Sequence, residues 1–287
     1  MSNSSIEVLD GITAITNKKP HFEKLDLKVK PDVQDFFKRH NDIVGVIHFA
    51  ASKAVGESVA EPLMYYENNI TTLIYMLQGL SGLSKKNFIF SSSCTVYGQA
   101  DEQIGEEIIR DTCKVNGDIN AIALRYFNPV GSHPSAEIGE LPIGVPQNLV
   151  PFITQTGIGM REQLSVFGGD YPTSDGTCVR DYIHVVDLAK AHVVALQRLI
   201  ESKNDSNYEF FNLGTGTGST VLEAIQSFER VSGKTLNYKI VDRREGDITA
   251  AYAETSKANN VLGWKTQLTL DDAMDSAWKW EQKIRNK

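Results

Sequence analysis

The sequence lacks the features that mark membrane, secreted and nucleic-acid-binding proteins. No apolar run approaches the roughly 20 residues that a membrane-spanning helix needs. The net charge of −7 provides no basic footprint for a nucleic acid. The first residues, MSNSSIEVLDG, contain neither the basic region nor the apolar stretch of a signal peptide. We therefore expect no membrane attachment and no nucleic-acid partner.

Cysteine is also scarce. Cys94, Cys113 and Cys178 are odd in number and far apart, so they offer neither a disulfide framework nor the spacing of a metal site. Free thiols, buried or half-buried, are typical of a reducing compartment. The expected location is the cytoplasm.

Apolar runs that alternate with helical patterns indicate the fold class. Continuous apolar runs are typical of parallel strands buried on both faces, and helices between them favour an α/β fold with a parallel sheet. The shorter segment 20–27 alternates enough to be predicted as a further strand. The elements predicted in this half are strands at 20–27, 44–52, 87–98 and 120–131 and helices at 31–40 and 61–80.

The character of the chain changes near residue 132. Residues 133–152 are rich in proline and glycine and are predicted to form a long loop, which inside a compact domain is usually functional. Asp187 precedes an apolar helical pattern and is predicted to cap that helix. The remaining predicted elements are a helix at 188–203, a strand at 208–214 and helices at 221–233 and 271–285.

Three successive predicted strands end in small or polar residues. These ends are Phe49–Lys53, Ser91–Ser93 and Phe127–Asn128. Any strand end must turn, and turns favour serine and asparagine, so one such end alone carries little information. Ligands of doubly wound sheets bind outside the carboxyl ends of the strands. Three polar ends in one sheet therefore favour a binding site.

Several motifs resemble those of UDP-glucose 4-epimerases, which are NAD-dependent isomerases of the extended short-chain dehydrogenase/reductase superfamily. The similarity covers nearly the whole chain, in the order found in that family. The motifs are IHFAASKAVGES (47–58), FIFSSSCTVYG (88–98), LRYFNPVGSHPS (124–135), DGTCVRDYIHVVDLA (175–189), FNLGTG (211–216) and RREGD (243–247). The strand-end motifs are shared with other sugar-nucleotide enzymes. A sugar-nucleotide dehydratase or reductase fits two further segments, RYFNPVG (125–131) and QNL (147–149), less well.

The resemblance implies a fold, a reaction and a domain organisation. The fold would be a doubly wound, Rossmann-like parallel sheet, incomplete at its N-terminal end, with a smaller C-terminal substrate-binding region. Residues 1–131 would be the remnant of an NAD-binding domain, and 132–287 would mainly bind a UDP-sugar, with 180–220 contributing back to the sheet. The family interconverts UDP-glucose and UDP-galactose in galactose metabolism. NAD takes a hydride from C4, the keto sugar rotates, and the hydride returns to the other face. Family members are homodimers.

The resemblance also implies roles for individual residues. Ser93 matches the catalytic hydroxyl that holds the sugar oxygen. Arginine presents a fork of donors suited to a diphosphate, and a carboxylate can hold a ribose diol. Arg180 and Arg244 taken alone would be read as solvated surface charges, but their motifs favour a diphosphate clamp. The implied cofactor contacts are Asp26, Leu27, Phe49, Ala50, Lys53, Asn68 and Phe127, and the implied substrate contacts are Asn128, Asn148, Leu149, Phe167, Arg180, Arg244 and Asp247.

The sequence also departs from the family pattern. It contains no GxxGxxG turn, whose glycines let a backbone approach a pyrophosphate. None of its ten tyrosines is followed by a lysine four residues later, and the loop and first part of the catalytic helix are expected to be absent. We therefore expect a truncated relative that is impaired or inactive. The alternative is a non-catalytic remnant that at most binds a UDP-sugar.

Two further segments have competing interpretations. GTGTGST (214–220) follows a strand, but its spacing is not GxGxxG, so a framework role is expected. In the family, the residue four places beyond the RREGD aspartate limits the space at the sugar 2-position, which corresponds to Ala251 here. A small residue there would also admit UDP-N-acetylhexosamines. A shift of one residue would place Tyr252 at this position instead.

Overall fold

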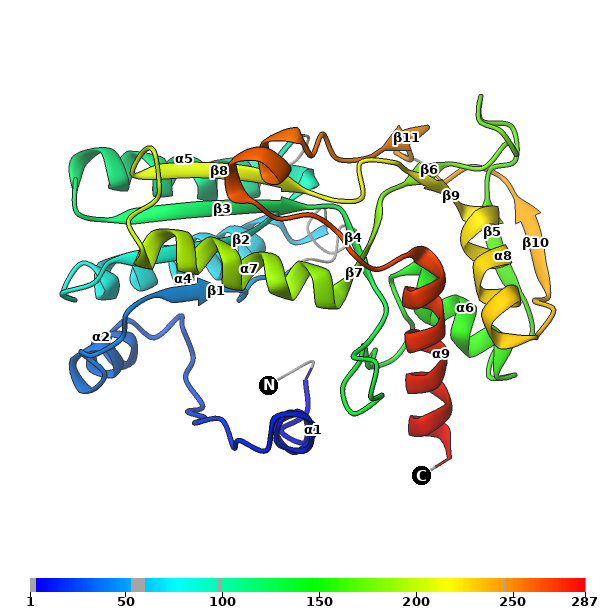
Figure 1. Ribbon diagram of the computed structural model, residues 1–287, viewed down its shortest axis with the longest axis horizontal. Helices are drawn as coiled ribbons and strands as arrows, with labels where there is room; N and C mark the ends of the chain where they lie inside the picture. The colour runs from blue at the N-terminus through cyan, green and yellow to red at the C-terminus, as the bar shows by residue number, and fades with distance from the viewer. Residues whose placement is uncertain (1–3, 53–59, 98–99, 245, 287) are drawn as a thin grey trace.

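A four-stranded parallel sheet forms the centre of the N-terminal part in the computed structural model, which describes residues 4–52, 60–97, 100–244 and 246–286 (Figure 1). Its strand order is β1-β2-β3-β8. Ser93 is in register with Tyr126, so the carboxyl ends of neighbouring strands lie level. This sheet is Rossmann-like, as the sequence predicts. Its strands are β1 (Val46–His48), β2 (Asn87–Ser93), β3 (Asn120–Tyr126) and β8 (Tyr208–Leu213).

Helices cover both faces of this sheet. Helix α7 (Val185–Ile200) lies in front of the strands in Figure 1, and α4 (Pro62–Leu80) and α5 (Ala100–Val115) lie behind them. Successive strand residues point to opposite faces. The fully buried Phe88 accordingly packs in the cluster that includes α4, and its equally buried neighbour Ile89 packs in the cluster that includes α7. The continuous apolar run of β2 is thus explained by burial on both sides.

A second, smaller unit of helices and one strand pair lies beside the sheet (Figure 1). Phe228 of α8 and Trp278 of α9 meet edge to face in its core, with ring centroids 5.3 Å apart. Both helices begin with a capping box, in which Thr220 pairs with Glu223 and Thr269 pairs with Asp272. The unit contains α6 (Leu149–Gly157), α8 (Val221–Ser232), α9 (Leu270–Arg285) and the parallel pair β5 (Leu164–Phe167) and β10 (Tyr238–Val241).

Short ladders connect the two parts. β4 (Asn128–Val130) pairs with β7 (Tyr182–His184), and β6 (Val179–Arg180) pairs with both β9 (Ser219–Thr220) and β11 (Ala250–Ala251). The division of the chain at residue 131 stays a prediction, as does the role of 180–220. The structure also contains a 3-10 turn at Cys94–Tyr97 and a π-helix at Ala258–Leu262. No helix of the described ranges has the length and apolar character to cross a membrane.

Most predicted helices and strands are confirmed, with shorter boundaries in several cases. The helix predicted at 31–40 is α2 (Lys30–Arg39), and the strand predicted at 44–52 is reduced to the three residues of β1. The run at 87–98 is a strand only to Ser93, and the run at 120–131 divides into β3 and β4.

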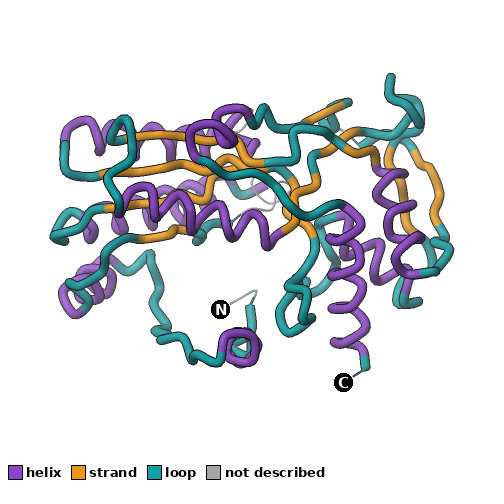
Figure 2. Tube along the Cα trace, in the orientation of Figure 1, coloured by secondary structure: helices purple, strands orange, loops and turns teal. Residues whose placement is uncertain are grey.

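The strand predicted at 20–27 is wrong. Residues 17–29 form a loop that connects α1 (Val8–Thr16) to α2, as Figure 2 shows. Leu25 and Leu27 pack against the core cluster that contains residues of α2 and α4. An extended loop with one packed side produces the same alternation as a strand, so the pattern alone could not distinguish them.

Three helices, α1, α5 and α6, were not predicted from the sequence, and α6 begins inside the loop predicted at 133–152. Helix α5 lies in the segment where we expected the first part of the catalytic helix to be absent. Its buried Glu106 holds it to the sheet, because Arg125 Nη2 donates to Oε2 at 2.6 Å, Ser92 Oγ donates to Oε1 at 2.7 Å and Tyr208 OH donates to Oε2 at 2.7 Å. Although burial opposes the effect, these donors lower the pKa of Glu106. The carboxylate is therefore a charged anchor for α5.

Helix α1, also unpredicted, is packed through a glycine. A Cβ on Gly11 would lie 2.6 Å from the carbonyl oxygen of Glu137 and 2.6 Å from Ile138 Cγ2. Only glycine allows this approach, which joins α1 to the loop at 133–148.

The prediction that Asp187 caps α7 is wrong. The N-cap residue is His184, whose Nδ1 accepts from the backbone N–H of Val186 at 3.1 Å. Asp187 lies in the first turn, where its charge suits the helix dipole. Its buried Oδ2 accepts from the backbone N–H groups of Gln267 at 2.7 Å and Leu268 at 2.8 Å. The carboxylate is therefore used to hold the segment that precedes α9.

A second buried carboxylate, Asp181, connects the two parts of the molecule. It is fully buried between β6 and β7. It accepts from the backbone N–H of Thr215 at 2.8 Å, from the Thr215 hydroxyl at 2.7 Å, from Gly216 N at 3.3 Å and from Ala253 N at 3.1 Å. A Cβ on Gly214 would lie 2.2 Å from its Oδ2, so glycine makes this approach possible. Four donors compensate the burial of one charge.

We predict that Asp181→Asn lowers the free energy of unfolding by roughly 1.5–3 kcal/mol. The asparagine side chain carries no charge, and its N–H groups would face the backbone N–H groups that now donate to the carboxylate. Urea denaturation would measure the change. Asp42→Asn, at an exposed position, removes the same charge and should leave the midpoint unchanged. Equal stability of the two variants would contradict this account.

Candidate functional site

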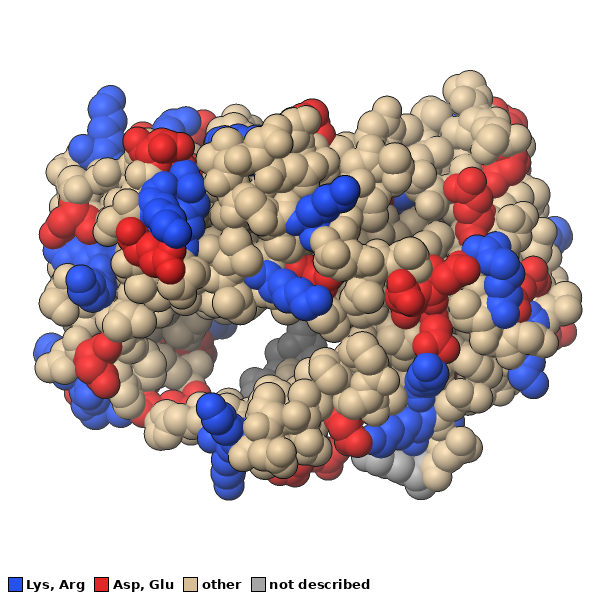
Figure 3. Space-filling model, viewed as in Figure 1, with Lys and Arg blue, Asp and Glu red and all other residues tan. Residues whose placement is uncertain are grey.

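A cavity of about 1180 Å³ lies at the carboxyl ends of the parallel strands. Its wall continues along the loop before α6 and onto β5 and β6, so both parts of the chain contribute to it. Figure 3 shows that the molecule is hollowed on this face, between the sheet-bearing part and the N-terminal segment. The predicted site residues that line the cavity are Phe49, Ala50, Ser93, Phe127, Asn128, Asn148, Leu149, Phe167, Arg180, Arg244 and Asp247.

Other predicted site residues are not part of this wall. Asp26 accepts from the backbone N–H of Lys28 at 3.0 Å, and Leu27 packs against the core below α2. Asn68 stands behind the wall, where its side-chain amide donates to Ser52 Oγ at 3.0 Å. Lys53 lies outside the described residues. The cofactor roles of these four residues stay predictions.

Ser91 was predicted as part of a polar strand end, but its partners Tyr126 and His192 were missed by sequence reasoning. The hydroxyls of Ser91 and Tyr126, which both line the cavity, lie 3.0 Å apart, and Ser91 Oγ lies 3.3 Å from His192 Nε2. His192 Nδ1 lies 2.9 Å from the carbonyl oxygen of Leu188, which can only accept, so Nδ1 carries the proton and Nε2 is the acceptor. Burial lowers the pKa of His192. Serine, tyrosine and a neutral imidazole thus form a hydrogen-bonded series that begins at the cavity wall.

The histidine on β1 is electrostatically neutral as well. His48 lines the cavity but is buried, and burial lowers its pKa to about 4. Phe49, the next residue, has an exposed ring that lies 4.6 Å from the ring of His192, measured between centroids. The strand-end part of the cavity therefore combines aromatic surface with neutral donors and acceptors.

The opposite end of the cavity carries positive charge. Arg180 Nη2 and Arg244 Nη2 both donate to Asp247 Oδ1, at 3.2 Å and 2.8 Å. Two guanidinium groups share one carboxylate, which leaves a surplus of one positive charge. The hydrogen bond with Asp247 raises the pKa of Arg244. The Arg244 side chain remains 62 % exposed, and its guanidinium lies 5.8 Å from the centre of the exposed Phe167 ring. This end of the cavity can bind an anion through the guanidinium groups and an aromatic ring that stacks on Phe167.

The loop before α6 closes one side of the cavity. Asn148 is the N-cap residue of α6, and its side-chain amide donates to Glu140 Oε1 at 2.7 Å. Val8 of α1 also lines the wall, next to the loop that Gly11 contacts. The loop predicted at 133–152 is a loop only to residue 148, because α6 begins at Leu149, and it contributes directly to the site.

The glycine-rich stretch 214–220 and Tyr97 both lie outside this cavity. The glycine-rich stretch 214–220 does not contribute to its wall, and the Thr215 and Gly216 amides donate to Asp181 instead of to a ligand. Tyr97 lines a separate cavity of about 510 Å³, where its hydroxyl accepts from Arg125 Nη1 at 3.1 Å and donates to Asn212 Oδ1 at 2.8 Å. Neither feature supplies a group to the larger cavity.

Comparisons with known proteins agree with this geometry. Residues 4–214 match the model of the NAD dependent epimerase/dehydratase family. The chain is 45 % identical over 300 residues to the UDP-glucose 4-epimerase of Mus musculus, covering 98 % of this chain and 85 % of that protein.

Solved structures give the same result. A UDP-glucose 4-epimerase from Stenotrophomonas maltophilia, with bound NAD and formylated UDP-arabinopyranose, is 41 % identical with a TM-score of 0.94, covering 100 % of this chain and 90 % of that one. The enzyme from Bifidobacterium longum, in complex with NAD+ and UDP, is 40 % identical with a TM-score of 0.90, covering 99 % and 89 %.

The match to the family model, the identity over nearly the whole chain and the shared Rossmann-like sheet lead to one conclusion: the chain belongs to the UDP-glucose 4-epimerase family, within the NAD dependent epimerase/dehydratase proteins.

Proposed function

We propose that this chain acts on UDP-glucose and UDP-galactose and interconverts them at C4, with NAD as the hydride carrier. The observation that carries the proposal is the single cavity that contains both the polar strand ends and the Arg180–Arg244–Asp247 group. The similar proteins from Stenotrophomonas maltophilia and Bifidobacterium longum, solved with NAD and with uridine nucleotide ligands, support it.

The arginine end is proposed to hold the uridine diphosphate. Arg244 offers exposed guanidinium donors to the diphosphate, and Arg180 is kept in place because its Nη1 also donates to the carbonyl oxygen of Ile248 at 2.9 Å. The exposed ring of Phe167 offers a surface on which the base can stack. Asp247 orients both guanidinium groups and is available to the ribose hydroxyls.

The strand-end part is proposed to hold the reacting sugar. Ser93 and Asn128 line the cavity there and can hydrogen-bond to sugar hydroxyls. Ser91 Oγ donates to Tyr126 OH in the structure, and rotation of the Ser91 hydroxyl toward His192 Nε2 would reverse this hydrogen bond. A proton leaving the sugar 4-hydroxyl can then pass to Tyr126, whose own proton passes through Ser91 to His192 Nε2. This route uses neutral groups with an acceptor at its end, and it takes the place of the tyrosine–lysine pair that the sequence does not contain.

The residues present fit the nicotinamide half of NAD better than its diphosphate. Phe49, Ala50 and Phe127 form an open aromatic and small-residue surface at the strand ends, where a flat ring can lie beside the sugar. The sequence has no GxxGxxG turn to receive the pyrophosphate. When bound, NAD supplies the hydride acceptor and donor for C4. A homodimer is part of the same family-based proposal.

A second candidate function is binding of a UDP-sugar without turnover. The absence of a tyrosine–lysine pair in the sequence favours it, because a positioned general base contributes roughly a hundred- to ten-thousand-fold to a rate. The two functions share the arginine end of the cavity and differ in whether the proton route at the strand ends is effective.

The first test is turnover. We predict a rate at least roughly a hundred-fold below that of the Mus musculus relative, measured side by side in a coupled assay with purified proteins. Residual turnover should fall in Tyr126→Phe, which breaks the proton route, and be unchanged in Tyr97→Phe, which alters the separate cavity. Equal rates for this chain and the relative would contradict the predicted impairment, and equal loss in both variants would contradict the route.

The second test is binding at the arginine end. We predict that Arg244→Ala weakens UDP binding roughly ten- to hundred-fold, the loss expected for a hydrogen bond to a charged group, and leaves any NAD binding unchanged. Calorimetry would measure both. Arg243→Ala is the matched control, because this neighbouring arginine pairs with Asp170 at 2.7 Å and stacks on Tyr171. Equal weakening by both variants would show only a general charge effect.

The third test concerns the substrate 2-position. Ala251 pairs with Arg180 in the β11–β6 ladder, which supports a location near the arginine end, although neither Ala251 nor Tyr252 contributes to the described cavity wall. We predict that UDP-N-acetylglucosamine binds as well as UDP-glucose and that Ala251→Tyr weakens only the N-acetylated sugar. Competition against UDP would measure both. Identical binding of both sugars by the variant would exclude Ala251 as the limiting residue.

A further inference from the structure

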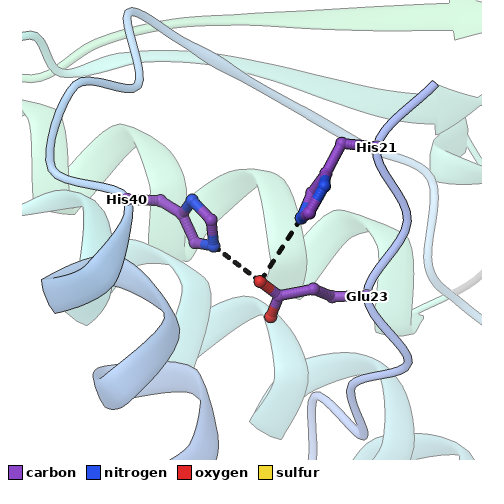
Figure 4. Close-up of side chains that lie close together, drawn as sticks. All are labelled: His21, Glu23 and His40. Carbon is purple, nitrogen blue, oxygen red and sulfur yellow. Dashed lines mark hydrogen bonds and ion pairs between the residues drawn. The ribbon is translucent and has the colours of Figure 1, made fainter. Parts of the chain in front are cut away.

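Two histidines and a glutamate converge at the N-terminal part of the molecule, away from the cavity. Figure 4 shows the side chains of His21, Glu23 and His40, with both imidazole rings directed at the carboxylate. His21 and Glu23 belong to the loop between α1 and α2, and His40 directly follows α2. One potential ligand atom from each residue lies within 4.8 Å of the other two.

The separations of these atoms suit a small, four-coordinate metal ion. His40 Nε2 lies 2.7 Å from Glu23 Oε1, and His21 Nε2 lies 3.5 Å from the same oxygen. Nitrogen and oxygen ligands bind zinc at about 2.0–2.1 Å in a tetrahedral arrangement, which puts ligand atoms about 3.3–3.4 Å apart. The 3.5 Å separation already matches this geometry. The 2.7 Å separation needs a modest widening once a metal replaces the hydrogen bond.

We propose that His21, Glu23 and His40 form a Zn²⁺ site with its fourth position open to water. Two imidazoles and one carboxylate are a ligand set that zinc favours. The site is independent of the proposed epimerase activity, because none of its residues lines the large cavity.

The carboxylate is held in place before a metal binds. It accepts from Arg39 Nη1 at 2.9 Å, and its Oε1 lies 2.7 Å from His40 Nε2. The His21 side chain is 76 % exposed and can rotate, whereas those of His40 and Glu23 are 29 % and 25 % exposed and are held by their surroundings. Two ligands are thus prepositioned and the third is mobile.

Arg39 limits the affinity of the site. Its Nη1 donates to Glu23 Oε1 at 2.9 Å, the oxygen that both histidines face, and its Nη2 donates to Oε2 at 3.0 Å. A zinc ion at Oε1 must displace Nη1 and tolerate a neighbouring positive charge. The Nη2 bond to Oε2 can persist and orient the carboxylate from outside. Removing the guanidinium should therefore strengthen zinc binding, a result that a simple surface ion-pair cluster does not predict.

Zinc at this position would fasten an irregular segment to a helix. Residues 17–29 contain no strand, and the Glu23 interactions with Arg39 and His40 are among their links to α2. A ligand that binds only the folded arrangement stabilises it in proportion to the logarithm of its concentration over Kd. The segment should therefore become more resistant to proteolysis when zinc is bound.

The experiment uses the full chain, freed of any affinity tag and treated with chelator, titrated with ZnCl2 by calorimetry. We expect one equivalent to bind. His21→Ala, His40→Ala and Glu23→Gln each change one ligand and should weaken zinc binding at least roughly ten-fold. Loss of a residue that only hydrogen-bonds to a metal ligand already weakens binding by that much. Arg39→Gln should bind several-fold more tightly. Asp35→Asn is the matched control, because it removes the same charge as Glu23→Gln from beside Arg39 and leaves the ligand set intact.

Limited proteolysis provides a second readout on the same proteins. Zinc should slow cleavage within residues 17–29 in the wild type and in Arg39→Gln, and not in His21→Ala, whose exposed side chain can be removed without disturbing the core. Absence of zinc binding in both the wild type and Arg39→Gln would overturn the proposal. Undiminished binding in a folded His21→Ala, His40→Ala double variant would overturn it as well, because the metal would then lie elsewhere.

Discussion

The position of the cavity depends on the buried carboxylate of Asp181. A charge removed from water is tolerated only where donors surround it, and Thr215, Gly216 and Ala253 provide them. The residue separates β6 from β7. β7 pairs with β4, which begins with Asn128, and β6 pairs with β11, a few residues beyond Asp247. One hydrogen-bonded carboxylate therefore fixes the strand ends relative to the arginine end.

The cavity has a polarity that follows from this arrangement. Its arginine end has a surplus positive charge, whereas the histidines near the strand ends are neutral because burial lowers their pKa. An anionic ligand with an uncharged sugar at one end is therefore oriented before any chemistry begins. Under the proposed function, the electrostatics would select the direction of binding, and the hydroxyls of Ser91, Ser93 and Tyr126 would meet the uncharged part.

Much of the fold and part of the site were predictable from the sequence. Buried strands such as β2 and helices such as α4 have strong patterns, and all seven substrate contacts predicted from the motifs line one cavity. The extended loop at 20–27 was mistaken for a strand because Leu25 and Leu27 pack on one side, which mimics alternation. Helix α5 was missed because Glu106, its anchor, has partners on three different strands.

The hydrogen-bonded series from Tyr126 to His192 could not be read from local patterns. Ser91 and His192 are 101 residues apart in the chain, and only the packing of α7 on the sheet brings them together. A histidine on a mostly apolar helix face reads as a core residue, and His192 is indeed buried. Long-range side-chain pairs of this kind depend on tertiary structure, which periodicity does not encode.

The glycine contact between α1 and the loop at 133–148 has a consequence for how a ligand enters the cavity. Val8 lines the wall, yet α1 is joined to the remainder of the chain through residues 17–29, which form no strand. A nine-residue helix attached in this way opens at a lower free energy than the sheet behind it. Helix α1 can therefore detach from the cavity wall while the sheet stays folded. We expect α1 to control how fast a ligand enters and leaves the cavity, and the sheet and the arginines to control its free energy of binding.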